Sequence, residues 1–115
     1  MSKIFNKVKG DLGEEKAVKF LKRHRYKILE KKFNTRIGEI DIIASKKNII
    51  HFVEVKYRKN TDYGYPREAV NYYKQKRIRR TAEYYCMLKK IRDVELSFDI
   101  IEIIDKKLNF IENAF

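Results

Sequence analysis

The stretch GEIDIIASKKNIIHFVEVKYR, residues 38–58, has two runs rich in β-branched and aromatic residues on either side of a short polar turn. The runs Ile37–Ser45 and Ile49–Tyr57 are predicted to form neighbouring strands, and Lys46–Asn48 the turn between them. Both strands are apolar on both faces near their centres, so we expect other elements to cover both faces of the sheet.

Side chains alternate between the two faces of a strand, which predicts the neighbours of each charged residue. On one face of the first strand we expect Glu39, Asp41 and Ile43. On its opposite face we expect Ile40, Ile42 and Ala44. In the second strand, Glu54 and Lys56 are expected to share a face with Phe52. Asp41 and Glu54 are therefore predicted to be carboxylates with apolar neighbours on paired strands.

Two partly buried carboxylates are costly unless a cation compensates their charge. A divalent metal suits them, because Mg²⁺ prefers carboxylate oxygens, accepts backbone carbonyls and keeps several waters. Asp41 and Glu54 are candidate ligands, with the carbonyl of Val55 as a third. Lys56 is expected to point into the same site, where it would help deprotonate a water or neutralise charge developing on a phosphate.

A simpler interpretation of these residues is structural. A Glu-x-Lys pattern is common, and Lys56 would then form a cross-strand ion pair with Asp41 or Glu54. The metal site is favoured by the hydrophobic context of the two acids, by the tight turn between their strands and by the basic charge of the whole chain.

The rest of the chain supplies helices and further strands around this pair. Ala17, Val18 and Leu21 share one helical face with Glu14, which makes Glu14 the single acid on a face expected to be buried. The predicted elements are a helix from near Asp11 to about Arg25, a strand over Tyr26–Phe33, a loop over Lys59–Pro66, a helix from Arg67 or Glu68 to about Lys90, and strands over Leu96–Ile104 and Leu108–Glu112. The order αβββαββ predicts a single α/β domain, residues 1–115, with a mixed sheet and one helix on each face.

Composition narrows the class of protein. Lys and Arg number 28 and Asp and Glu 16 in 115 residues, a formal net charge of +12 that favours a polyanionic partner. Cys86 is the only cysteine, which excludes an intrachain disulfide and a cysteine-based zinc site. No apolar run is long enough to span a bilayer and no secretory signal is recognisable, so we expect a cytoplasmic protein that does not bind membranes.

The second predicted helix contains five cations in seven residues, 74–80. Lys and Arg contacts with phosphates give sequence-independent affinity for nucleic acid, although such a helix could also serve only solubility. The residues expected to contact nucleic acid are Arg58, Lys59, Lys74, Lys76, Arg77, Arg79 and Arg80. The same helix carries the pairs Tyr72–Tyr73 and Tyr84–Tyr85, whose rings could stack on unpaired bases or belong to the core.

Several spaced blocks resemble the YraN family of small proteins. They include Gly10-x-x-Gly13-Glu14, residues 38–44, residues 52–58, Tyr63-Gly64-Tyr65-Pro66 and residues 98–101, and together they cover nearly the whole chain. That family is similar to the PD-(D/E)xK nuclease superfamily, with archaeal Holliday-junction resolvases as its nearest relatives in kind. The resemblance implies a restriction-endonuclease-like core.

The resemblance also assigns roles. Asp41 and Glu54 match the metal-binding acids of the motif, Lys56 matches its lysine, and Glu14 matches the helix-borne acid of the resolvases. A capping or first-turn acid is the structural alternative for Glu14. The usual proline before the motif aspartate is replaced here by Ile40, and Ser97 stands where the family often has arginine.

The function expected from these features is a Mg²⁺- or Mn²⁺-dependent nuclease that acts on DNA, including branched or structured DNA, by attack of a metal-activated water on a phosphodiester. Asp41, Glu54, Lys56 and Glu14 are the expected catalytic residues. A four-way junction is cut symmetrically by a dimer, so a homodimer is a candidate assembly for this chain. The alternative is a nucleic-acid-binding module without catalysis, and no residue in the sequence excludes RNA as the ligand.

Overall fold

The computed structural model describes residues 3–58 and 70–115, with the backbone alone for 3–11 and for Arg58. The elements in chain order are α1 (Lys3–Arg23), β1 (Lys27–Asn34), β2 (Glu39–Lys46), β3 (Ile49–Arg58), α2 (Tyr72–Leu88), β4 (Glu95–Ile104) and β5 (Lys107–Ile111). The described strands form one sheet in the order β1-β2-β3-β4-β5, in which β3 and β4 are parallel and the other neighbours antiparallel. The predicted α/β fold, with a mixed sheet and the order αβββαββ, is confirmed.

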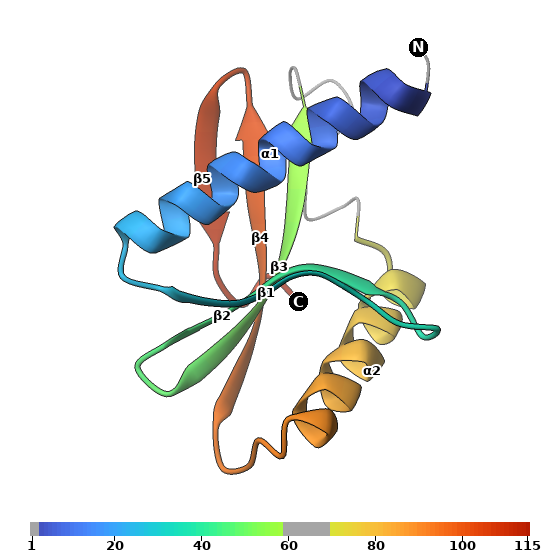
Figure 1. The fold of residues 1–115 in the computed structure, drawn as a ribbon, viewed down its shortest axis with the longest axis vertical. Helices are drawn as coiled ribbons and strands as arrows, with labels where there is room; N and C mark the ends of the chain where they lie inside the picture. Colours follow the sequence, from blue (N-terminus) through green and yellow to red (C-terminus); the bar gives the residue numbers. More distant parts are fainter. Residues whose placement is uncertain (1–2, 59–69) are drawn as a thin grey trace.

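The two helices cover opposite faces of the sheet, as Figure 1 shows. Ala17, Val18 and Leu21 of α1 pack on one face, in a cluster that includes Ile42, Ala44, Val53 and Ile101. On the opposite face, α2 contributes Ile78, Ala82 and Tyr85 to a cluster that includes Ile40, Ile43, Phe52, Phe98 and Ile100. This arrangement explains why the central strands are apolar on both faces.

Helix α1 begins earlier than predicted. The backbone is already helical from Lys3, so Asp11 lies inside α1 and is not its cap. The predicted start of α2 at Arg67 or Glu68 and the predicted loop over Lys59–Pro66 lie outside the described residues. Within them α2 begins at Tyr72, because Asn71 is extended and its side chain accepts a hydrogen bond from the Lys74 N–H at 2.9 Å.

Strand β2 bends at Asp41, and this corrects the predicted assignment of its faces. Ile40 was expected on the same face as Ile42, but Ile40 packs with Ile43 on the α2 side while Ile42 packs on the α1 side. Pairing of β2 with β3 ends at Ile42, opposite Val53. In β1, Lys32 has a φ of 50°, and its neighbours pair with Ile42 and Ile40, so the backbone is irregular opposite Asp41.

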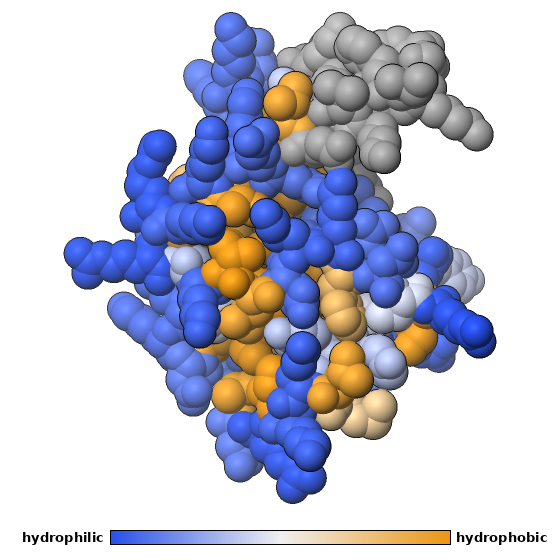
Figure 2. Space-filling model, viewed as in Figure 1, coloured by the Kyte–Doolittle hydropathy of each residue, from blue (hydrophilic) through white to orange (hydrophobic). Residues whose placement is uncertain are grey.

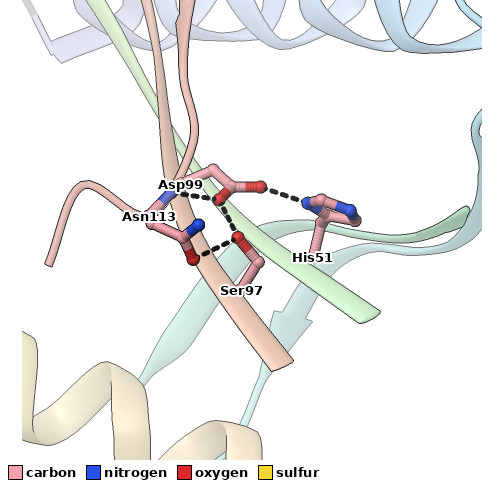
Figure 3. Close-up of polar contacts among 4 residues, drawn as sticks. All are labelled: His51, Ser97, Asp99 and Asn113. Atoms are coloured by element: carbon pink, nitrogen blue, oxygen red, sulfur yellow. Dashed lines mark hydrogen bonds and ion pairs between the residues drawn. The ribbon is translucent and has the colours of Figure 1, made fainter. Parts of the chain in front are cut away.

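A buried polar network joins β3, β4 and the C-terminal residues (Figure 3). Asp99 is fully buried; its Oδ2 lies 2.5 Å from His51 Nδ1, and its Oδ1 accepts from the Ser97 hydroxyl at 2.5 Å and from the Asn113 N–H at 3.0 Å. The Ala114 N–H donates to the Phe98 carbonyl at 2.8 Å. The network satisfies a carboxylate inside the core and fixes the end of the chain against β4.

Apolar residues form a band down the middle of the face drawn in Figure 2, between regions of hydrophilic residues. In the part of the chain that the structure describes, no helix is both long and apolar enough to cross a membrane.

The network predicts a large effect of removing its central carboxylate. In Asp99→Ala, His51, Ser97 and the Asn113 N–H lose their common partner inside the core, so the free energy of unfolding should fall by about 3 kcal/mol. Urea unfolding followed by circular dichroism measures this change. Glu95→Ala, at an exposed position in the same strand, is the control and should change the value by less than about 0.5 kcal/mol. An Asp99→Ala protein as stable as the native chain would contradict the assigned role of the network.

Candidate active site

Asp41 of β2 and Glu54 of β3 both line one cavity of about 200 Å³ between the sheet and α2, called here the α2-side cavity. Among the described residues, its lining is Gly38, Glu39, Asp41, Glu54, Lys74, Arg77 and Ile78. The tip of the β1–β2 hairpin approaches α2 closely (Figure 1). A Cβ added at Gly38, at this tip, would lie only 3.0 Å from the Thr81 hydroxyl oxygen of α2. The cavity therefore combines three acids from the sheet with two cations from one face of α2.

The bend in β2 positions the Asp41 carboxylate. Beyond the Ile42–Val53 pair, where the β2–β3 pairing ends, Asp41 Oδ2 accepts a hydrogen bond from the Val55 N–H at 2.8 Å. A side chain thus bonds to the β3 backbone next to Glu54, and this fixes the orientation of a half-buried carboxylate. The second oxygen of Asp41 is not used in this bond.

Glu54 is the buried acid of the cavity, with 4% of the residue exposed. Burial and the negative charge of Asp41 raise its pKa from the ordinary 4.5 to about 6, although Lys74 and Lys56 act in the opposite direction. Lys74 Nζ lies 3.1 Å from Glu54 Oε2. A buried carboxylate whose ionisation is opposed by burial and by a neighbouring acid gains from an added cation.

Lys56 and Lys74 form a pair of cations with different proton affinities. Burial, together with the hydrogen bond and charge of Lys74, lowers the pKa of Lys56 to about 8. Burial also lowers the pKa of Lys74, but its hydrogen bond with Lys56 and the negative charge of Glu54 outweigh that effect, so the pKa of Lys74 is raised. Lys56 is therefore the one of the two that loses its proton more readily.

Glu14 lies on the other side of Asp41. It is half-buried and lines a second cavity of about 370 Å³ between α1 and the sheet, together with Lys32, Asp41 and Ile42. Lys32 Nζ lies 3.8 Å from Glu14 Oε2. Among the described residues no three His, Cys, Asp or Glu side chains are close enough together to hold a metal ion. The structure brings Asp41 and Glu54 to one cavity, and Glu14 as a metal ligand stays a prediction.

The residues expected to bind nucleic acid fall into separate groups. Lys74 and Arg77 line the α2-side cavity. Lys76 lies over the Tyr72 ring at 4.7 Å, and the Arg79 guanidinium lies 4.5 Å from the centre of the Phe98 ring. Arg80 is exposed. Arg58 ends β3, and its side chain, like Lys59, is outside the described residues.

Two features of the site were not predicted from the sequence. Glu39 lines the cavity with Asp41. In the parallel β3–β4 pair, Glu102 lies beside Lys56, and among the described residues its Oε2 is buried with no hydrogen-bond partner. Only the first could have been indicated by the sequence, because Glu39 stands two residues before Asp41, whereas the second depends on the register of β4.

Residues 13–103 match the model of a family described as "Uncharacterised protein family UPF0102". A UPF0102 protein of Persephonella marina is 42% identical over 112 residues, covering 97% of each chain. One from Acetivibrio thermocellus is 46% identical over 128 residues, covering 99% of this chain and 98% of the relative. One from Clostridium perfringens is 47% identical over 119 residues, covering 98% of each. These names state no activity.

The raised pKa of Glu54 makes a prediction for stability. Because the folded chain holds this proton up to about pH 6, against an ordinary pKa of 4.5, ionisation of Glu54 opposes folding as the pH rises. Glu54→Gln should therefore be more stable than the native chain by up to about 2 kcal/mol at about pH 7.5, and the gain should vanish at about pH 4.

Urea unfolding at both pH values measures the difference. Glu83→Gln, which replaces an exposed carboxylate of α2, is the matched control and should change stability by less than about 0.5 kcal/mol at either pH. Equal effects of Glu54→Gln at the two pH values would show that Glu54 ionises without cost.

Proposed function

The chain belongs to the uncharacterised protein family UPF0102, which is the YraN family that its motifs resemble, and we propose that it is a metal-dependent nuclease acting on DNA. One observation carries the proposal: Asp41, buried Glu54 and Lys74 line one cavity, and Lys56, whose pKa is lowered to about 8, interacts with all three of them. Groups with shifted pKa values in a cavity are typical of catalytic sites. The net charge of +12 favours a polyanionic substrate.

The donor atoms of the cavity fit a hard divalent cation. Asp41 and Glu54 would hold Mg²⁺ or Mn²⁺ through carboxylate oxygens, and the Val55 carbonyl and Glu14 are the further ligands expected from the sequence. Two protein carboxylates are a usual number for Mg²⁺, which keeps much of its water shell. When bound, such an ion supplies charge neutralisation at the scissile phosphate and lowers the pKa of water.

Lys56 is suited to move a proton in this site. With a pKa of about 8 it is partly neutral near physiological pH, and a neutral amine accepts a proton from an attacking water. Its protonated form would instead stabilise negative charge that develops on the phosphate. Lys74 keeps its proton more firmly and stays a cation beside Glu54.

Phosphate groups of the substrate would be held by cations at the cavity and along α2. Lys74 and Arg77 line the cavity itself, and exposed Arg80 extends the positive surface. Such contacts are independent of base sequence, so a nuclease built on them would select the shape of DNA, such as a branch or a flap, before its sequence.

The second candidate function is nucleic-acid binding without cleavage. It is favoured by the 3.1 Å contact between Lys74 and Glu54, because the lysine already neutralises the buried acid without a metal. The same cations would then bind phosphates, and the acids would only position them. DNA and RNA would both be ligands of such a module.

A cleavage assay separates the two functions. The chain is incubated with Mg²⁺ or Mn²⁺ and with duplex, single-stranded, flap and four-way-junction DNA of one sequence. We expect cleavage of at least one substrate, and Asp41→Asn, Glu54→Gln and Lys56→Met should each lower its rate by about 100-fold or more. Binding of the same DNA, measured in EDTA, should change by less than about tenfold for the two acid variants, because they remove no phosphate contact.

Glu83→Gln is the control for an acidic residue of α2 away from the cavity and should cleave like the native chain. Salt-sensitive binding with no product under either metal would favour the binding module. Full cleavage by Glu54→Gln would exclude this cavity as the catalytic site.

Metal binding can be measured without substrate. Mg²⁺ or Mn²⁺ at about ten times its dissociation constant should stabilise the native fold by about 1.4 kcal/mol, seen as a higher unfolding temperature. Asp41→Asn and Glu54→Gln should lose this increase, and Glu83→Gln should keep it. An equal increase in all four proteins would mean that the ion binds elsewhere.

A further inference from the structure

Tyr72 and Tyr73 are a pair of exposed aromatic residues in the first turn of α2, with 61% and 74% of each residue exposed. Their ring centres are 5.7 Å apart and their planes are at 71°, so each ring limits the motion of the other. Lys76 Nζ lies 4.7 Å from the centre of the Tyr72 ring and holds that ring from a second direction. The chain thus presents ordered aromatic surface to solvent.

This pair is adjacent to the α2-side cavity. Arg77 follows Tyr73 by four residues and therefore lies one turn along the same helix face, and Arg77 lines the cavity. Lys74, the next residue after Tyr73, reaches Glu54 at 3.1 Å. If the phosphates of a nucleic-acid strand contact Lys74 and Arg77, the bases next to those phosphates would lie at Tyr72 and Tyr73.

The other aromatic pair of α2 has a different role. Tyr85 is buried in the core, and Tyr84 is half-buried with its ring 6.5 Å from that of Phe33. Core packing therefore accounts for the second pair and leaves the exposure of Tyr72 and Tyr73 unexplained. An aromatic face beside cations is the usual platform for an unpaired base, which duplex DNA does not present because its bases are already stacked.

We propose that Tyr72 and Tyr73 stack on unpaired bases of a nucleic acid whose backbone is held by Lys74 and Arg77, so that the ligand has a single-stranded segment next to the cavity. The inference rests on the proposed function for the direction of approach to the site. It narrows the substrate class to strands, flaps or junctions with splayed bases. Both rings are already ordered, so stacking costs little side-chain entropy.

Fluorescence anisotropy in EDTA tests this without cleavage. The probes are a labelled single-stranded oligonucleotide, a strand of equal length that keeps the sugar–phosphate backbone but has abasic residues, and a duplex; the first is also made as RNA. The native chain should bind the strand with bases about fivefold or more tighter than the abasic strand. Tyr72→Ala/Tyr73→Ala should abolish this difference and leave affinity for the abasic strand unchanged.

Tyr72→Phe/Tyr73→Phe keeps the rings and should keep the preference for bases. Met87→Ala removes an exposed apolar side chain at the other end of α2 and is the matched control. Equal binding of base-containing and abasic strands by the native chain, or a preference that survives the double alanine variant, would overturn the proposal. Base-dependent binding to DNA or to RNA supports it, and the two probes identify which strand is preferred.

The outcome is separate from that of the nuclease proposal. If no DNA is cleaved but base-dependent binding is lost in the double alanine variant, the stacking proposal holds and the nuclease proposal fails. If Asp41 and Glu54 are needed for cleavage but the tyrosines make no difference to base-dependent binding, the nuclease proposal holds and the stacking proposal fails.

Discussion

The bend of β2 at Asp41 is the constraint on which the site depends. A regular β2 would continue its backbone pairing with β3, and alternation would place Asp41 in the packed layer with Ile43. Because pairing stops at Ile42, the carboxylate can bond to the Val55 N–H and open onto the cavity that Glu54 lines. The departure from a regular ladder converts a strand residue into a positioned acid, a use of strand irregularity that is common near functional sites.

The charges of the cavity are balanced only in part. Burial of Glu54 next to Asp41 opposes ionisation, and Lys74 offsets part of that cost through direct contact. Burial, and after it the neighbouring Lys74, lower the pKa of Lys56, while the charges of Glu54 and Asp41 act in the opposite direction. Lys56 therefore releases its proton more easily than an ordinary lysine although two acids lie near it. A core optimised for stability alone would carry apolar residues there.

The fold was largely predictable because its strands and helices have strong periodic patterns. Phe52, Glu54 and the faces of β3 follow simple alternation, and the apolar stripe of α1 follows helical spacing. The bend at Asp41 could not be predicted, since the sequence shows neither where the β2–β3 pairing ends nor that Lys32, opposite Asp41, has a positive φ. The bond of His51 to Asp99 was also missed, because only the parallel register of β3 and β4 brings these two residues together. The cap of α2 at Asn71 was not predicted either, because the prediction rested only on the proline before the helix.

The cations of α2 show why net charge is a weak guide to a binding surface. Arg79 lies over Phe98, whose ring stacks on Phe52, so this cation covers the core as well as facing solvent. Arg77, two residues earlier, lines the cavity, and Lys76 lies over Tyr72. A helix whose charges served only solubility would not need one face to carry cavity-lining cations next to exposed aromatic rings. One side of α2 thus covers the core, and another side faces the cavity. The cations on the cavity side, Lys74 and Arg77, lie close to Asp41 and Glu54.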